Sequence, residues 1–254
     1  MSDKLAPAPT DLSDDTAPPG PLPDEPGRPP RLAMVRLPER LPRLTALVST
    51  EARAECLHRF ANHELQAIEM MAWAILRFRD APAPLRRGLV ALIGEEQEHL
   101  RLYLARLEAY GVALGDLPVS GNFWERTRDL QDPLAFLCAV GLTFESANLD
   151  FALLYRDAFT RAHAPDDAAV MQRVHQEEVG HVRFALTWLR RLKDPAESDL
   201  AAYRRATPFP LGLHRAKGRN FVASSRRAAG LDEEFIDAIR TARSPQQFAP
   251  RRGG

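Results

Sequence analysis

The sequence has little cysteine and no net charge, and both shortages exclude classes of protein. Its two cysteines, Cys56 and Cys138, each stand in an apolar run, so neither a disulfide framework nor a cysteine-based zinc site is expected. Acidic and basic residues balance at 34 each, which argues against a global field for nucleic acid or membranes. No apolar run reaches the roughly 18 residues of a membrane span, and the N-terminus has no secretory core. We therefore expect a cytoplasmic protein without a membrane span.

Strand-like alternation and glycine-rich phosphate loops are also missing, which argues against a nucleotide-binding α/β fold. The sequence has helical periodicity instead. Four long segments place apolar residues three and four positions apart, the spacing of one buried helix face. These segments cover residues 50–79, 84–110, 132–163 and 166–193.

The connections between the four segments predict the topology. "DAPAP" at 80–84 and "AHAPDD" at 162–167 are short and contain proline, so each joins antiparallel neighbours. About 20 residues separate the second segment from the third, enough to cross the length of a bundle. The sequence therefore predicts an all-α fold over residues 31–194: a ferritin-like four-helix bundle of two antiparallel hairpins with a long crossover and an N-terminal lead-in.

Both ends of the chain differ in composition from the predicted bundle. Residues 1–30 are rich in proline and poor in large apolar side chains, which predicts a disordered leader. Residues 195–254 form a less regular, basic extension, with 11 Arg or Lys against four acids from residue 203 onward and a short helix near 231–242. We interpret the extension as a solvated tail packed loosely on the bundle, with an arm that binds RNA or another polyanion as the alternative.

Two helices carry a Glu-x-x-His pair on their apolar face. Each helical residue advances about 100° around the axis. In "VHQEEVGHVRFA", Glu178 falls at the centre of the apolar stripe, and His181 lies about 60° away on the same face. In "EEQEHLRLYLARL", Glu96 and His99 repeat this arrangement. We expect both pairs to point into the core.

The other two long helices each place a single glutamate in the same way. Glu145 shares its stripe with Leu134, Cys138 and Leu149, and Glu64 is flanked by Leu57, Phe60 and Ile68. Two nearby glutamates do not fall on the apolar face of this helix. Glu55 of "ECLH" lies on the opposite side of its helix from Glu64, so the pair Glu55 and His58 is rejected. Glu69 falls about 140° from Glu64 and is expected on the surface.

Four inward carboxylates need a physical reason. A buried, unpaired carboxylate costs several kcal/mol or binds a proton. Two divalent metal ions would bring about four positive charges and leave the cluster nearly neutral. The competing interpretation pairs each glutamate with an arginine, but the apolar stripes carry no matching arginines, and Arg156 is the nearest candidate.

The motifs resemble a known group of proteins. One glutamate from each of two helices plus Glu-x-x-His from two others is similar to the ligand set of ferritin-like di-iron or di-manganese carboxylate proteins. The phrases "NHELQAIE", "EEQEHLRLYLARLEAYG", "GLTFESANLDFA" and "HQEEVGHVRFA" also resemble a bacterial ferritin-like family of unknown function. The resemblance covers about residues 50–193. It implies that the metal ligands are Glu64, Glu96, His99, Glu145, Glu178 and His181.

The ligand types favour two iron ions, with manganese as the alternative, although zinc accepts the same ligands. The implied function is an oxidase or hydroxylase that uses O2 on a small organic substrate, with an unidentified electron donor. Two alternatives stay open: an iron-handling protein, which would need an oligomer, and an interaction module that metal only stabilises. Tyr103, one turn after His99, is expected near the ligands as a core tyrosine or an electron carrier. His175 flanks Glu178 and is expected beside the ligands or at the edge of the bundle.

Overall fold

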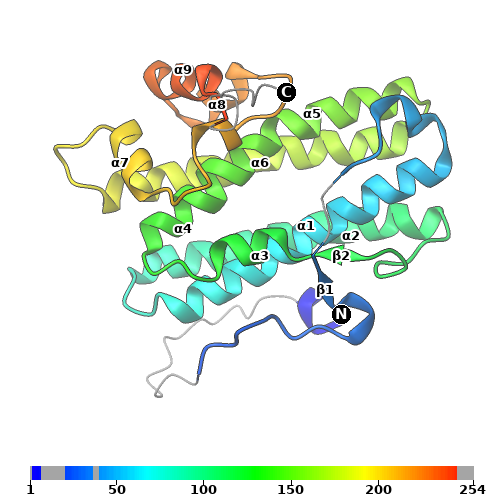
Figure 1. Ribbon diagram of the computed structural model, residues 1–254, viewed down its shortest axis with the longest axis horizontal. Helices are drawn as coiled ribbons and strands as arrows, with labels where there is room; N and C mark the ends of the chain where they lie inside the picture. Colours follow the sequence, from blue (N-terminus) through cyan, green and yellow to red (C-terminus); the bar gives the residue numbers. More distant parts are fainter. Residues whose placement is uncertain (1, 7–20, 37–39, 245–254) are drawn as a thin grey trace, which may run out of the picture. The chain divides into compact units, whose positions relative to one another are not determined.

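A computed structural model describes residues 2–6, 21–36 and 40–244 of the chain (Figure 1). Helices make up most of this part, and the all-α class predicted from periodicity is confirmed. Ser49 begins the first long helix, because its Oγ accepts a hydrogen bond from the N–H of Ala52 at 3.1 Å. Pro82 and Pro165 stand at the starts of the second and last long helices, where a missing N–H breaks no helical hydrogen bond.

The long helices match the predicted segments to within two residues at each end, except that the third segment is built from three consecutive pieces. The elements are α1 (Thr50–Arg77), α2 (Ala83–Ala109), α4 (Pro133–Ala139), the π-helix η4 (Val140–Glu145), α5 (Ser146–Arg161) and α6 (Pro165–Leu192).

The chain divides into two compact units, which we describe separately. Unit 1 comprises Met1–Pro133 and Tyr155–Val174, and unit 2 comprises Leu134–Leu154 and His175–Gly254. The boundary falls inside α5 and α6, so each of these helices continues from one unit into the other.

In unit 1, α1 and α2 form a hairpin and pack along each other (Figure 1). Phe60 on α1 meets the ring of Tyr155 edge-on, with ring centroids 4.9 Å apart. The hydroxyl of Tyr103 on α2 donates to the sulfur of Met171 at 3.5 Å. All four side chains are buried, so the last part of α5 and the first part of α6 share the apolar core of the hairpin.

Within unit 1, the N-terminal region contacts α1 through Glu69. This glutamate was expected on the surface, and that expectation is wrong: Glu69 is 6% exposed. Lys4 and Arg28 both pair with its carboxylate, with Arg28 Nε 2.9 Å from Oε1. Two cations of the leader predicted over residues 1–30 therefore bind a buried carboxylate. Residues 1 and 7–20 of the expected leader lie outside the described part.

A small parallel sheet joins the N-terminal region to the connection after α2. Strand β1 (Met34–Val35) pairs with β2 (Val119–Ser120), just before the short helix α3 (Asn122–Thr127). The Asn62 side chain on α1 donates to the carbonyl of Ser120 at 3.0 Å and fixes the sheet to the hairpin. No strands are evident in the sequence, because two-residue strands are too short to show alternation.

In unit 2, the helix that carries Glu145 is not uniform. The π-helix η4 contains Thr143, whose hydroxyl donates to the carbonyl of Cys138, five residues earlier, at 2.7 Å. Gly141 packs so closely against α6 that an added Cβ would lie 2.3 Å from the Cβ of Ala185. Single π turns inside α-helices are often found at functional sites.

The described part of the C-terminal extension packs into unit 2. Its most buried cation, Arg226, is 0% exposed and pairs with the equally buried Asp150 at 2.8 Å. This buried ion pair ties the described part of the extension to α5, which differs from the loose packing expected for a solvated tail. Residues 245–254 lie outside the described part. The helices of the extension are α7 (Asp199–Ala206), α8 (Ala223–Ala229) and α9 (Glu233–Thr241).

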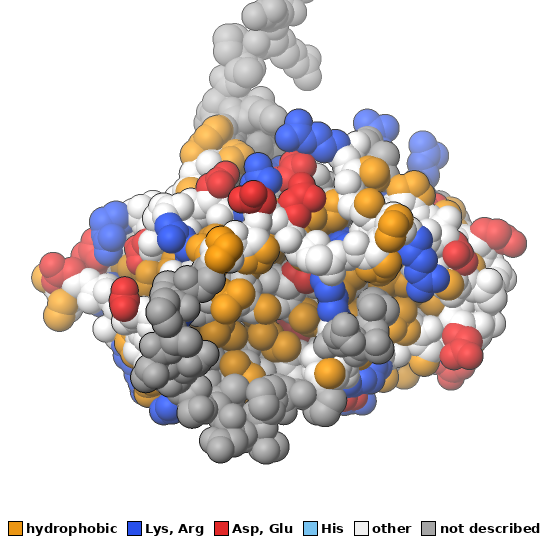
Figure 2. Space-filling model, turned by 90° about the horizontal axis from the view of Figure 1, so that it is seen from below, with side chains coloured by type: hydrophobic (Ala, Val, Ile, Leu, Met, Phe, Trp, Pro, Cys, Tyr) orange, Lys and Arg blue, Asp and Glu red, His pale blue; other side chains and the backbone are white. Residues whose placement is uncertain are grey.

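Among the described residues, one helical stretch, Pro133–Arg161, is apolar and long enough to cross a membrane. Its most apolar window is 72% buried inside the protein. Core helices of soluble proteins pass the same test, so the stretch is weak grounds for a span and is compatible with a soluble protein. On the face drawn in Figure 2, acidic and basic side chains are interspersed, in keeping with the balanced charge of the sequence.

Candidate metal centre

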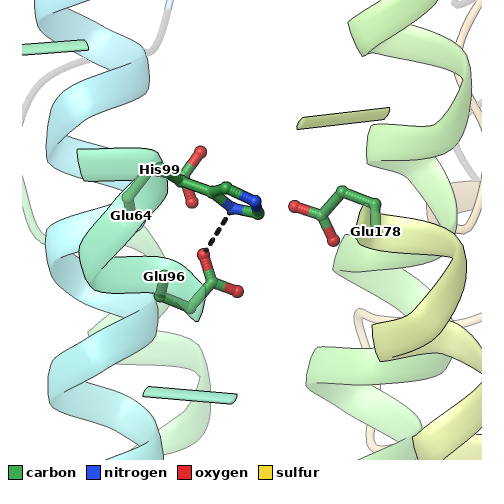
Figure 3. Close-up of side chains that lie close together, drawn as sticks. All are labelled: Glu64, Glu96, His99 and Glu178. Carbon is green, nitrogen blue, oxygen red and sulfur yellow. Dashed lines mark hydrogen bonds and ion pairs between the residues drawn. The ribbon is translucent and has the colours of Figure 1, made fainter. Parts of the chain in front are cut away.

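Helices α1 and α2 bring three of the predicted ligands together in unit 1. Glu64, Glu96 and His99 each offer a ligand atom within 4.8 Å of the others. Glu64 is 6% exposed, and the other two are 0% exposed. Nδ1 of His99 lies 3.2 Å from Oε2 of Glu96, the contact that is dashed in Figure 3. The fourth side chain labelled there, Glu178 on α6, belongs to unit 2.

Unit 2 brings the other three predicted ligands together. Glu145, Glu178 and His181 also offer ligand atoms within 4.8 Å of one another, and all three are buried. Nδ1 of His181 lies 3.3 Å from Oε2 of Glu178, which repeats the distance found in unit 1. The Asn148 side chain on α5 donates to Oε1 of Glu178 at 3.0 Å. Each unit therefore contributes two carboxylates and one imidazole.

The apolar stripes explain why these polar groups are held in dry surroundings. Leu92 and Leu100 flank Glu96 one turn before and one turn after, and Val174 and Val182 flank Glu178 in the same way. All four apolar side chains are buried. Because Glu96 and Glu178 stand on the same helix faces as these side chains, they are buried too.

The donor set fits divalent metal ions. Carboxylate and imidazole ligands suit iron and manganese. Buried carboxylates are costly without a neutralising charge, and a divalent ion bound by two carboxylates and one imidazole supplies that charge. The buried clusters of Glu and His could therefore hold metal.

The rejected pair, Glu55 and His58, has an ordinary structural role. Glu55 pairs with Arg59 at 2.7 Å on the same helix. Nε2 of His58 accepts a hydrogen bond from the N–H of Gly115 at 2.9 Å. Burial lowers the pKa of His58 to about 4, which keeps the ring neutral and its acceptor nitrogen available.

A family model described as "Protein of unknown function (DUF455)" matches residues 4–237, most of the chain and all six predicted ligands. The chain belongs to the DUF455 family. No curated protein and no solved structure matches it. The resemblance of this DUF455 member to ferritin-like proteins therefore stays a prediction, argued below from its own residues.

One polar side chain of the cluster in this DUF455 chain, Asn148, was not predicted from the sequence. Its signal was present: Asn148 stands three residues after Glu145, where His99 and His181 stand relative to their own glutamates. An asparagine at this position holds Glu178 by a hydrogen bond, and such bonds orient metal-binding carboxylates.

The other residues considered from the sequence have described partners. Tyr103 is 1% exposed and bonds Met171. Nε2 of His175 lies 3.3 Å from the hydroxyl of Ser225 on α8. Arg156, the arginine nearest in sequence that might have neutralised a core glutamate, instead pairs with Asp157 at 2.7 Å.

Proposed function

We propose that this chain is a ferritin-like protein with two metal ions, iron or manganese, and that it uses O2 to oxidise or hydroxylate a small organic substrate. The observation that carries the proposal is the repetition of one ligand set. Each unit buries one lone glutamate and one Glu-x-x-His pair, with ligand atoms within 4.8 Å. The proposed ligands are Glu64, Glu96, His99, Glu145, Glu178 and His181.

Contacts inside unit 1 support an antiparallel arrangement of α2 and α6, as a four-helix bundle requires. Tyr103 on α2 bonds Met171 on α6 at 3.5 Å. Arg106, three residues further along α2, bonds Asp167 at 2.7 Å, four residues earlier on α6. Residue numbers therefore rise along one helix as they fall along the other.

Helix geometry extends this register to the predicted ligands. Seven residues, about two turns and 10 Å, lead back from Tyr103 to Glu96 on the same face of α2. Seven residues lead forward from Met171 to Glu178 along the uninterrupted α6. We propose that the two sets of ligands belong to one dinuclear centre, as the resemblance to ferritin-like carboxylate proteins implies.

The charge of such a centre supports two ions rather than one. Four carboxylates carry four negative charges, and two divalent cations cancel them, while each neutral imidazole adds a ligand without charge. A single divalent ion would leave about two negative charges in a dry core, at a cost of several kcal/mol.

The chain's own residues determine what such a centre can do. When bound, a pair of redox-active metals supplies electrons to O2 and so allows an organic substrate to be oxidised. The buried Leu and Val side chains beside Glu96 and Glu178 keep bulk water away from the ligands. Tyr103, one turn after His99, has a buried hydroxyl, and we propose that it lies near the reacting groups.

We also propose a cytoplasmic location. Cys56 and Cys138 are both free and buried, and burial raises the pKa of the Cys56 thiol to about 12. An inert, reduced thiol suits a reducing compartment. RNA remains the alternative partner considered from the sequence, but described cations of the extension are engaged within the chain: Arg226 with Asp150, Arg227 with Glu233, and Arg240 with Asp237.

The test is metal analysis of protein purified without oxygen. We expect two iron or manganese ions per chain, in line with the charge argument. Glu96→Ala and His99→Ala should each lower the metal content well below two. Glu98→Ala is the matched control, because Glu98 stands on the same helix and pairs with Arg101 at the surface.

Three other results would contradict the proposal. If Glu96→Ala and Glu98→Ala lower the metal content equally, the assignment of Glu96 to the buried face and Glu98 to the exposed face of α2 is wrong. Iron loading far above two per chain would indicate an iron-handling protein. A metal-loaded protein that is inert toward O2 would indicate an interaction module that metal only stabilises.

A further inference from the structure

Two side chains of the C-terminal extension bond the chain on either side of Glu145, one in the π-helical turn and one at the start of α5. The hydroxyl of Tyr203 on α7 lies 2.7 Å from Oγ1 of Thr143. Nη2 of Arg226 on α8 donates to the carbonyl of Ser146 at 2.8 Å. These two contacts fall two residues before Glu145 and one residue after it, so the extension brackets this ligand.

The bond from Tyr203 continues into the backbone of the turn. Oγ1 of Thr143 donates its own proton to the carbonyl of Cys138, so the Tyr203 hydroxyl must be the donor in its bond to Thr143. Burial raises the pKa of Tyr203, which keeps this proton in place. A π turn departs from the usual i to i−4 bonding of a helix, and side-chain bonds of this kind stabilise the departure.

Helix α8 also contacts the helix that carries the Glu-x-x-His pair of unit 2. Ser225, next to Arg226, bonds His175, one turn before Glu178. Gly141, in the π-helical turn, touches Ala185, one turn after His181. The extension and the turn therefore form one packed assembly around the three ligands of unit 2.

We propose that Tyr203 and Arg226 are positioning residues for Glu145, because they hold the π-helical turn in the conformation that presents its carboxylate to metal. This inference rests on the metal centre proposed above. In this proposal the C-terminal extension holds the π-helical turn in place. Neither a solvated tail nor a polyanion-binding arm would do so. Outer hydrogen-bond partners of metal ligands typically change metal affinity by about 10-fold to 100-fold.

The experiment uses Tyr203→Phe, which removes one hydroxyl and keeps the ring in its contact with Phe235. Co²⁺ is titrated into the metal-free protein against a chelator, and its visible absorption bands report the ligand geometry. We expect about 10-fold weaker Co²⁺ binding and altered bands. The control is Tyr110→Phe, which also removes a bonded phenol hydroxyl but one that bonds Asp167 in unit 1.

A second pair of variants tests the same bond from its other end. Thr143→Val should reproduce the loss, and Thr143→Ser, which keeps the hydroxyl, should restore wild-type binding. Wild-type affinity and bands in both Tyr203→Phe and Thr143→Val would overturn the positioning role and leave the metal centre standing. If the wild-type protein itself binds no Co²⁺, iron or manganese, the proposed function fails, and the positioning role fails with it.

Discussion

The ion pair between Arg226 and Asp150 makes a prediction about stability that can be worked from the structure. Both side chains are 0% exposed, and the guanidinium also donates to the carbonyls of Ser146, Ala216 and Val222 at 2.8, 2.7 and 3.1 Å. Arg226→Met removes these bonds and leaves a buried carboxylate with only its bonds from the N–H groups of Gly218 and Val222.

Breaking a buried pair from one side typically costs about 3–5 kcal/mol. The two retained N–H bonds lower this cost, while loss of the two fully buried bonds to the Ser146 and Ala216 carbonyls adds about 1 kcal/mol each. We therefore expect Arg226→Met to lower the free energy of unfolding by about 4 kcal/mol. For a urea slope of about 3 kcal/mol per M, the midpoint falls by about 1.3 M.

The assay is urea unfolding followed by circular dichroism, with metal-free protein so that ligand binding does not contribute. Arg227→Met is the matched control, because the neighbouring Arg227 pairs with Glu233 at the exposed surface, and its midpoint should hardly move. The double variant Arg226→Met with Asp150→Asn should recover part of the loss, since it removes the buried charge. A midpoint for Arg226→Met equal to that of Arg227→Met would refute the reasoning.

Two further predictions concern pH and packing. The folded-state pKa of His58, about 4, lies below its ordinary value of 6.5, so the unfolded chain binds more protons than the folded chain between these two pH values. The free energy of unfolding should therefore fall by about 3 kcal/mol as the pH drops from above 6.5 toward 4. His58→Gln should flatten this part of a stability profile measured by urea unfolding, and an unchanged slope would contradict the assignment. Gly141→Ala should lower the thermal midpoint, because its Cβ would overlap that of Ala185, at a cost of about 1–3 kcal/mol. Gly94→Ala, with nothing within 4 Å of the added Cβ, should raise the midpoint through better helix propensity, and the same sign for both variants would mean that the close contact is not real.

The long helices and the two buried clusters of Glu and His could be predicted from the sequence because both depend on local pattern. Ser49, Pro82 and Pro165 mark helix starts, and a period of 3.6 residues determines which side of each helix is apolar. The inward position of Glu96 and Glu178 follows from the same period. Helix ends and buried helix faces could therefore be predicted without knowing any contact between residues distant in the sequence.

The features that were missed depend on partners far away in the chain. Glu69 lies off the apolar stripe of α1, but Lys4 and Arg28 cover it. Asp150 and Arg226 are 76 residues apart, so neither predicts the other. The π turn changes the helix by a single residue, which an apolar pattern tolerates without a visible break. In each case burial is decided by tertiary contact and not by local propensity.

The contact between Lys4 and Glu69 has a practical consequence for handling this protein. A purification tag joined at residue 1 extends the segment that delivers the Lys4 ammonium group to a buried carboxylate. A chain that begins after residue 28 would lack both Lys4 and Arg28, the two cations that pair with the Glu69 carboxylate. A shortened chain that is less stable than the full chain would therefore report the loss of the counter-ions of Glu69.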